Sequence, residues 1–226
     1  MKEIYGKKVY DTLGEIVNPR HTALLVIDVQ NDFCSPEGQF SKGGLETSTL
    51  QKLVPKVIQF IDEARKTGIF VAFIQNTTMR NGLSDSPAWL HFKSKAPGVA
   101  PEYTIEGTWG HRFCDGLEPR EEEPVIQKCR SSAFVNTNLD LVLRSNGIES
   151  IIITGCVTHG CVLATARHGA FLDYYVVVAK DCVESNNAGL HEAALRIMES
   201  RLDVASSEEI LNEWPKLNKQ GQRNLP

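Results

Sequence analysis

Short apolar runs alternate along the chain with segments in which apolar residues recur every three or four positions. The runs lie at residues 22–28, 69–74, 124–128, 150–154 and 174–179. Runs without regular polar alternation are typical of strands buried on both faces, as in a parallel sheet that helices cover. We therefore expect these runs to be strands of one mainly parallel sheet.

The intervening segments have the periodicity of amphipathic helices. The clearest helix is expected at 49–66, where the apolar residues share one face and the pattern stops at Gly68. Further helices are expected at 137–146, at about 160–172 and at about 188–199. Strands and helices that alternate in this way are joined by right-handed crossovers. The predicted fold class is α/β, with one three-layer α/β/α domain over 1–226 and its core at about 20–205.

Two parts of the chain depart from this alternation. The segment 76–123 has no sustained strand pattern and only one weak helical stretch, at 88–95, although it is rich in aromatic residues. Irregular segments of this length are uncommon in compact domains unless they bind ligands. We expect it to cover a small-molecule pocket, the alternative being an excursion packed on the sheet edge. A polar tail is expected at 212–226, and its part after Trp214 is expected to be frayed or docked on another subunit.

Charge and composition narrow the classes of partner and location. The 226 residues include 24 Lys and Arg against 28 Asp and Glu, a formal net charge of −4. This balance argues against nucleic acid or an anionic membrane as the main partner. No apolar run reaches the roughly 18 residues of a membrane span, and the N-terminus lacks a signal-peptide pattern. We expect a cytoplasmic protein with free thiols, since no two of its six cysteines have metal-binding spacing.

Three residues with complementary chemistry follow predicted strands. Asp28 ends the first strand, Lys128 ends the strand at 124–128, and Cys161 lies just after the strand at 150–154. Ligands of parallel sheets bind beyond the carboxyl ends of the strands, so these residues are expected in one cleft. A helix N-terminus and a nearby ammonium would both favour the Cys161 thiolate. Each residue alone also has a structural interpretation, as a turn cap, a solvated flank and a small core residue, respectively.

Three segments in this order resemble a known family. They are Leu24–Phe33 (LLVIDVQNDF), Lys128–Phe134 (KCRSSAF) and Thr154–Ala166 (TGCVTHGCVLATA). Together they are similar to the isochorismatase-like cysteine hydrolases, and the similarity runs from about residue 20 to 200. The resemblance implies a Rossmann-like topology with a mainly parallel six-stranded sheet.

The resemblance also implies roles for individual residues. Asp28, Lys128 and Cys161 match the catalytic triad, and the Cys156–Val157 bond matches a non-proline cis peptide. The backbone N–H groups of Val157 and Cys161 would form the oxyanion hole. The implied reaction is attack of Cys161 on a carbonyl, with Asp28 as base and then acid, through a thioester or thiocarbamate.

Departures from the family patterns favour one branch. Nicotinamidases of this family have an Asp-x-His plus His metal site, whereas Asp85 here is followed by Ser86 and Pro87. We therefore expect no metal and no cofactor. The segments resemble most the amidohydrolase branch that acts on small ureido or carbamoyl compounds, such as N-carbamoylsarcosine amidase, ureidoacrylate amidohydrolase and biuret or triuret hydrolases. An isochorismatase-type hydrolase, a nicotinamidase-like amidase and a non-enzymatic binding protein remain alternatives.

Amide, guanidinium, hydroxyl and aromatic side chains near the strand ends are candidates for binding a small amide or ureido substrate. The candidates are Gln30, Asn31, Phe33, Gln75, Asn76, Arg130, Phe134 and Thr158, with Trp89 or Trp109 closing the pocket. Relatives commonly form dimers or tetramers, so a homo-oligomer is expected.

Overall fold

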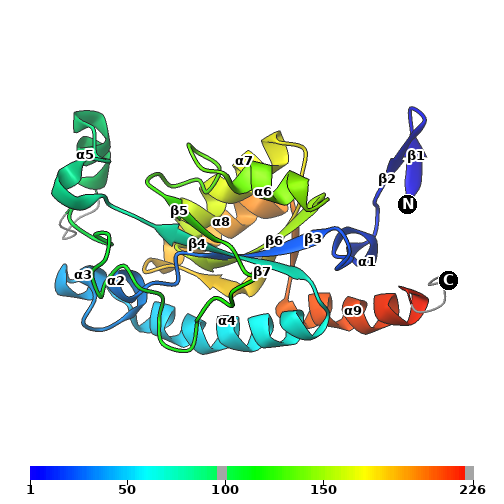
Figure 1. The fold of residues 1–226 in the computed structure, drawn as a ribbon, viewed down its shortest axis with the longest axis horizontal. Helices are drawn as coiled ribbons and strands as arrows, with labels where there is room; N and C mark the ends of the chain where they lie inside the picture. Colours follow the sequence, from blue (N-terminus) through cyan, green and yellow to red (C-terminus); the bar gives the residue numbers. More distant parts are fainter. Residues whose placement is uncertain (96–100, 222–226) are drawn as a thin grey trace.

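A six-stranded parallel sheet forms the centre of the computed structural model, which describes residues 1–95 and 101–221 (Figure 1). Its order is β5 (Val125–Lys128), β4 (Phe70–Asn76), β3 (Thr22–Ile27), β6 (Ser150–Cys156), β7 (Tyr175–Glu184) and β8 (Asp203–Ala205). Every neighbouring pair is parallel. The predicted α/β class and parallel sheet are confirmed. The sixth strand is β8, which was not among the five apolar runs.

The continuous apolar character of the central strands follows from burial on both faces. In β3, Leu24 and Val26 pack into one core cluster, whereas Ala23, Leu25 and Ile27 pack into the other. All five side chains are fully buried. Because successive strand residues point to opposite faces, a strand between two layers of helices needs apolar residues at every position.

Helices form a layer on each side of this sheet. One face is covered by α4 (Ser48–Lys66) and α9 (Ser207–Gly221), and the other by α6 (Leu139–Ser145), α7 (Leu163–Phe171) and α8 (Ala188–Glu199), as Figure 1 shows. A short π-helical turn, Thr158–Val162, precedes α7. The four predicted helices are therefore present, with boundaries shifted by a few residues at most. In the described residues, no helix is long and apolar enough to cross a membrane.

The segment between β4 and β5 passes beyond the carboxyl end of the sheet. It contains a 3₁₀ turn at Arg80–Gly82 and the helix α5 (Pro87–Lys93), which begins at the N-cap Ser86 with proline in the first helical position. Isolated bridges join Gln30 to Phe113 and Thr78 to Ile105. Apart from Asn76, which ends β4, its described part contains no strand, as predicted.

The C-terminal segment differs from the predicted polar tail. Helix α9 extends from Ser207 to Gly221, and Trp214 within it is 1% exposed. The Trp214 ring stacks on Phe60 of α4, 5.7 Å between centroids, and its Nε1–H donates to the Val17 carbonyl at 2.9 Å. The expected tail from residue 212 is therefore wrong for 212–214, because Trp214 belongs to the core. Residues 222–226 lie outside the described part.

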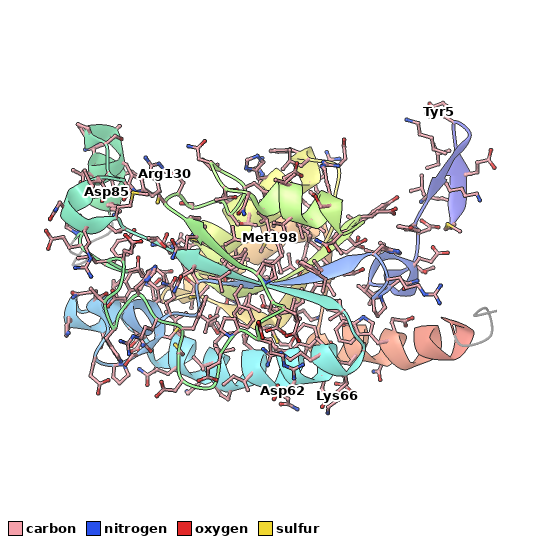
Figure 2. All side chains as sticks on the ribbon, viewed as in Figure 1. Tyr5, Asp62, Lys66, Asp85, Arg130 and Met198 are labelled. Carbon is pink, nitrogen blue, oxygen red and sulfur yellow. The ribbon has the colours of Figure 1, made fainter. Side chains whose placement is uncertain are left out.

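The N-terminus forms a hairpin that the sequence pattern did not predict. Strands β1 (Lys2–Ile4) and β2 (Lys7–Val9) pair antiparallel through a turn at Tyr5 and Gly6, both at positive φ. The hairpin projects away from the sheet and carries Tyr5 at its tip (Figures 1 and 2). Between the hairpin and β3 lies α1 (Leu13–Ile16), and after β3 come α2 (Asn31–Cys34) and α3 (Gln39–Lys42).

Candidate active site

The three chemically complementary residues meet at the carboxyl end of the sheet. Asp28 directly follows β3, Lys128 ends β5, and Cys161 lies in the turn that leads from β6 into α7. The Lys128 Nζ atom lies 2.7 Å from Asp28 Oδ2 and 3.2 Å from Cys161 Sγ. The side chains of Asp28 and Lys128 are 1% and 0% exposed. An acid–base group and a cation, both buried, thus form one cluster with a half-buried thiol.

The sheet order explains why a lysine is needed at the β5 position. Strand β4 separates β5 from β3, and Asn76 of β4 is in register with Lys128. The long lysine side chain reaches across this position to Asp28. On the way it donates a hydrogen bond of 3.3 Å to Asn76 Oδ1, which fixes the direction of the ammonium group.

The backbone around the cluster is unusually constrained. Asp28 has φ 54°, in the left-handed region that few non-glycine residues adopt outside special sites. Gly155 has φ 108°, and a Cβ atom there would lie 2.0 Å from the Ile27 carbonyl oxygen. Only glycine therefore allows β6 to approach β3 so closely next to Asp28. The peptide bond between Cys156 and Val157 is cis, and Cys156 Sγ donates to the Asp28 carbonyl at 3.1 Å.

Burial decides the protonation states of the triad. It raises the pKa of the Asp28 carboxyl, although the Lys128 charge opposes this shift. Burial and the charge of Asp28 also raise the pKa of Cys161 to about 12, and Lys128 only partly opposes them. The pKa of Lys128 is raised because the charges of Asp28 and Cys161 outweigh its own desolvation.

These shifts oppose the effect of the helix N-terminus and the ammonium, which by themselves favour a Cys161 thiolate. Desolvation of the half-buried thiol, together with the neighbouring carboxylate, outweighs the ammonium, so Cys161 rests as a thiol near neutral pH. The arrangement can still generate a thiolate when needed. Proton transfer from Cys161 to Asp28 leaves the total charge of the cluster unchanged, because one anion is exchanged for another beside Lys128.

A pocket of about 350 Å³ reaches this cluster. It is lined at its base by Asp28, Asn76, Cys156, Val157, Gly160 and Cys161. Phe33, Phe40 and Tyr103 form an aromatic group with ring centroids 4.7–6.0 Å apart, and α5 contributes Trp89 and Phe92. The size fits a small organic ligand.

Of the eight predicted substrate-binding residues, the structure brings Phe33 and Asn76 to this pocket lining. Gln30 and Gln75 instead donate to the His111 carbonyl, at 2.8 and 2.9 Å, and Asn31 donates to the Trp109 carbonyl at 3.0 Å. Gln30 also exchanges hydrogen bonds with the Asn76 backbone. These amides satisfy backbone groups of the segment that passes over them, which is why they do not line the pocket.

Three more predicted binders have other partners. Arg130 donates to the carbonyls of Ser84 and Cys129 and lies 4.7 Å from the Trp89 ring centroid. Phe134 packs against His168 and Tyr174 in the core. Thr158 Oγ1 is hydrogen-bonded to His191 Nδ1 at 2.8 Å. None of the three contributes to the described pocket lining.

Other lining residues were missed because they come from segments that lie far apart in the sequence. Lys93 and Lys95 come from the end of α5, and His159 and Asn186 come from the opposite side of the pocket. Asn186 was detectable by the strand-end rule, but β7 extends to Glu184, five residues beyond the predicted end at 179. Of the two tryptophans proposed to close the pocket, Trp89 lines it and Trp109 does not.

The described residues do not suit a metal ion at this site. They contain no group of three His, Cys, Asp or Glu side chains close enough to share one. Asp85, the carboxylate in the region where nicotinamidases hold a metal, forms a buried ion pair with Lys93 at 2.7 Å. Its charge is already neutralised by the Lys93 ammonium.

Comparisons with known proteins identify the family. The isochorismatase domain model matches residues 22–209. The chain is 35% identical to ureidoacrylate amidohydrolase RutB of Serratia proteamaculans (strain 568) over 172 residues, which cover 72% of this chain and 69% of that protein.

Solved structures agree with this assignment. An isochorismatase-like hydrolase from Alkaliphilus metalliredigens is similar with a TM-score of 0.73 and 27% identity, over 86% of this chain and 99% of that one. Nicotinamidase PncA from Bacillus subtilis is similar with a TM-score of 0.69 and 25% identity, over 82% of this chain and 99% of that one. The chain therefore belongs to the isochorismatase family.

Proposed function

We propose that this protein is a cysteine-dependent amidohydrolase that cleaves a C–N bond of a small ureido, carbamoyl or amide compound. The observation that carries the proposal is the buried contact of one ammonium with both a carboxylate and a thiol, at 2.7 and 3.2 Å. The similarity to a ureidoacrylate amidohydrolase supports a ureido substrate. The pocket volume of about 350 Å³ supports a small one.

The first half of the reaction forms an acyl-enzyme. Asp28 removes the proton of the Cys161 thiol while Lys128 stabilises the negative charge. The thiolate attacks the substrate carbonyl, and the backbone N–H groups of Val157 and Cys161 bind the oxyanion. The C–N bond breaks as Asp28 returns the proton to the departing nitrogen, which leaves as ammonia or an amine.

The second half releases the remaining fragment. Asp28, now ionised again, removes a proton from water, which attacks the thioester or, for a ureido substrate, the thiocarbamate. The C–S bond breaks and the thiol of Cys161 is restored, so the cycle consumes one water per C–N bond. No oxidant, metal or cofactor takes part in this scheme.

Ammonia release from a substrate panel tests the proposal. The panel contains biuret, triuret, N-carbamoyl amino acids, ureidoacrylate-like compounds and nicotinamide, each with and without a chelator. We expect chelator-insensitive release from a ureido compound, and a loss of at least about a thousandfold in kcat for Cys161→Ser. Cys129→Ser is the matched control, because this half-buried thiol lies next to Lys128 in sequence but not in the pocket.

Each other outcome has a definite meaning. Turnover of nicotinamide alone, lost with chelator, would overturn both the ureido assignment and the metal-free scheme. Turnover that survives in folded Cys161→Ser would reject the covalent mechanism. No ammonia from any compound would favour ether cleavage of the isochorismatase type or a binding role instead.

A further inference from the structure

Two consecutive residues of the π-helical turn that carries the nucleophile are hydrogen-bonded to side chains of another part of the chain. Thr158 Oγ1 forms a hydrogen bond of 2.8 Å with His191 Nδ1. His159 Nδ1 forms one of 2.7 Å with Ser185 Oγ. Ser185 directly follows β7, and His191 lies in the first turn of α8. The end of β7 and the start of α8 therefore hold this turn from outside.

The segment that holds the turn is itself closely fixed. Ser185 is 2% exposed, its N–H donates to Glu184 Oε1 at 2.8 Å, and its carbonyl accepts from Thr49 of α4 at 2.9 Å. Asn187 is the N-cap of α8 and accepts a hydrogen bond from the first turn of that helix. Glu184 Oε1 also lies 3.5 Å from His191 Nδ1. A carboxylate beside this nitrogen fixes the orientation of the imidazole ring.

The two hydrogen-bonded pairs differ in their relation to the pocket. His159 lines it, so a ligand can contact this ring directly. Neither Thr158 nor His191 is among the described lining residues, and Thr158 is fully buried. The bond between Thr158 and His191 therefore acts on the turn without contacting a ligand.

This bond lies next to the backbone donors of the proposed reaction. Thr158 follows Val157 and precedes Cys161 by three residues, and the N–H groups of these two neighbours are the proposed oxyanion donors. Within the turn, the Val157 carbonyl accepts from Gly160 at 2.9 Å and from Val162 at 3.4 Å. These bonds fix the shape of the turn, whereas its orientation at the end of β6 depends on contacts from outside. Catalysis is sensitive to that orientation, because a displacement of about 1 Å can cost about a hundredfold in rate.

We propose that His191 is a positioning residue for the nucleophile turn: through Thr158 it holds the Val157 N–H at the place where the oxyanion forms. The inference rests on the amidohydrolase function proposed above and adds a residue of α8 to its machinery. His191 takes no part in the proton transfers, since it reaches the reacting atoms only through Thr158.

Three variants test this role with the best substrate of the panel given above. His191→Phe keeps a ring of similar size without the hydrogen bond, and Thr158→Val removes the hydroxyl group with little change of volume. We expect each to lower kcat about ten- to a hundredfold while KM stays within about threefold of wild type. His191→Asn places an amide group at the position of Nδ1 and should recover most of the lost kcat.

A double-mutant cycle shows whether the two residues act as a unit. Because His191 acts through Thr158, the variant with both His191→Phe and Thr158→Val should be no slower than the slower single variant, within about threefold. Two independent effects would multiply instead.

Alkylation of Cys161 by iodoacetamide separates a displaced oxyanion donor from a displaced nucleophile. In this reaction the sulfur bonds to carbon, iodide leaves and the thiol proton passes to Asp28, so no oxyanion develops. We expect the alkylation rate of His191→Phe, followed by mass spectrometry of the Cys161 peptide, to stay within about twofold of wild type.

His21→Phe is the matched control. The half-buried His21 is hydrogen-bonded through Nε2 to the Glu15 carbonyl at 3.1 Å, and it directly precedes β3, at the opposite end of that strand from Asp28. It therefore undergoes the same chemical change away from the site, and both kcat and alkylation should stay within about twofold of wild type. Circular dichroism verifies folding, and Thr158→Val decides the test by the same criteria if His191→Phe does not fold.

Each result has a definite meaning. Non-additive losses of kcat with alkylation retained would support the positioning role. A kcat within about twofold of wild type in both single variants, or losses that multiply, would reject this role and leave the proposed function standing. Alkylation that slows in parallel with kcat would overturn it in favour of a general structural role. A wild type that releases ammonia from no compound would reject the proposed function, and this inference with it.

Discussion

At the scale of single residues, the triad depends on burial as much as on residue type. Aspartate, lysine and cysteine at strand ends could be predicted from the sequence, because parallel strands bring their carboxyl ends to one edge. The protonation state of Cys161 could not, since desolvation of the sulfur depends on packing around it. The roles of Gln30 and Gln75 were also unpredictable from their positions, because their partner, the His111 carbonyl, comes from a segment without a regular pattern.

The pH dependence of activity follows from the same burial. The reactive form has Asp28 ionised, Cys161 as a thiol and Lys128 protonated. Because the pKa of Asp28 is raised above its ordinary value of about 3.8, acidification removes the base at a higher pH than for an exposed aspartate. We expect kcat/KM to fall about tenfold per pH unit on an acidic limb above pH 4.

The alkaline side should be flat over a wide range. The pKa of Cys161 is about 12 and that of Lys128 is raised, so neither group changes state below about pH 10. Measurement of kcat/KM from pH 3 to 10, with circular dichroism to verify folding, checks both limbs. A profile that stays level down to pH 4 would be inconsistent with Asp28 as the general base, and a rise in kcat/KM near pH 8–9 would indicate an ordinary thiol.

At the scale of elements, predictability followed length and periodicity. The long helix α4 and the central strands were recognisable because each shows one uninterrupted pattern. Strands β1, β2 and β8 have three residues each, too few to show a pattern. Helix α9 was missed although Ile210, Leu211 and Trp214 have the spacing of one helix face and pack into the core. The course of 76–123 depends on single tertiary contacts, which no local pattern encodes.

Helix α5 is a clear case of an element held by tertiary contacts. It has seven residues, well below the length at which isolated helices are stable in water. The Lys93 ammonium, 2% exposed at its side chain, donates to Asp85 at 2.7 Å and to Thr78 Oγ1 and the Pro101 carbonyl at 3.1 Å. It also lies 4.8 Å from the Tyr103 ring centroid. This one side chain joins α5 to the segments on both sides of it.

We expect Lys93→Met to detach α5 from the pocket. The change leaves the Asp85 charge buried without a partner, a cost of about 3–5 kcal/mol that local unfolding of this region relieves. Amide hydrogen exchange should quicken in 87–93 while β3 and β6 keep their protection, and KM should rise at least about tenfold. The double variant with Asp85→Leu should recover part of the protection, because it removes the unpaired charge as well.

An exposed ion pair provides the matched control for that experiment. Lys66 and Glu63 lie 2.6 Å apart on α4, with side chains 66% and 42% exposed. Since such pairs contribute little to stability, Lys66→Met should change neither exchange in α5 nor KM. Unaltered exchange of α5 in Lys93→Met would show that the aromatic contacts alone position the helix.

At the scale of the whole molecule, the N-terminal hairpin projects away from the three-layer domain (Figure 1). Two-stranded hairpins are marginally stable in water unless they pack against something. Here the strands are mostly exposed, and Tyr5 at the tip is 99% exposed, with Ile4 at 43%. The polar contacts of the hairpin region, such as Lys2 with Asp11, are also at the surface. The three-layer domain therefore provides little packing surface that would stabilise the hairpin.

A second copy of the chain would supply the missing surface, in keeping with the homo-oligomer expected from the sequence. We predict that the full chain is a dimer or larger in solution and that removal of residues 1–9 shifts it toward the monomer at the same concentration. Light scattering coupled to size-exclusion chromatography measures this shift. The point variant Tyr5→Asp should act in the same direction, because a charge at the tip opposes burial of that side chain. Val125→Asp serves as a control. It changes an exposed apolar residue outside the hairpin, in the edge strand β5 at the other end of the sheet from β8. A full chain that is monomeric throughout, or an oligomer that survives loss of residues 1–9 unchanged, would show that the hairpin has no part in assembly.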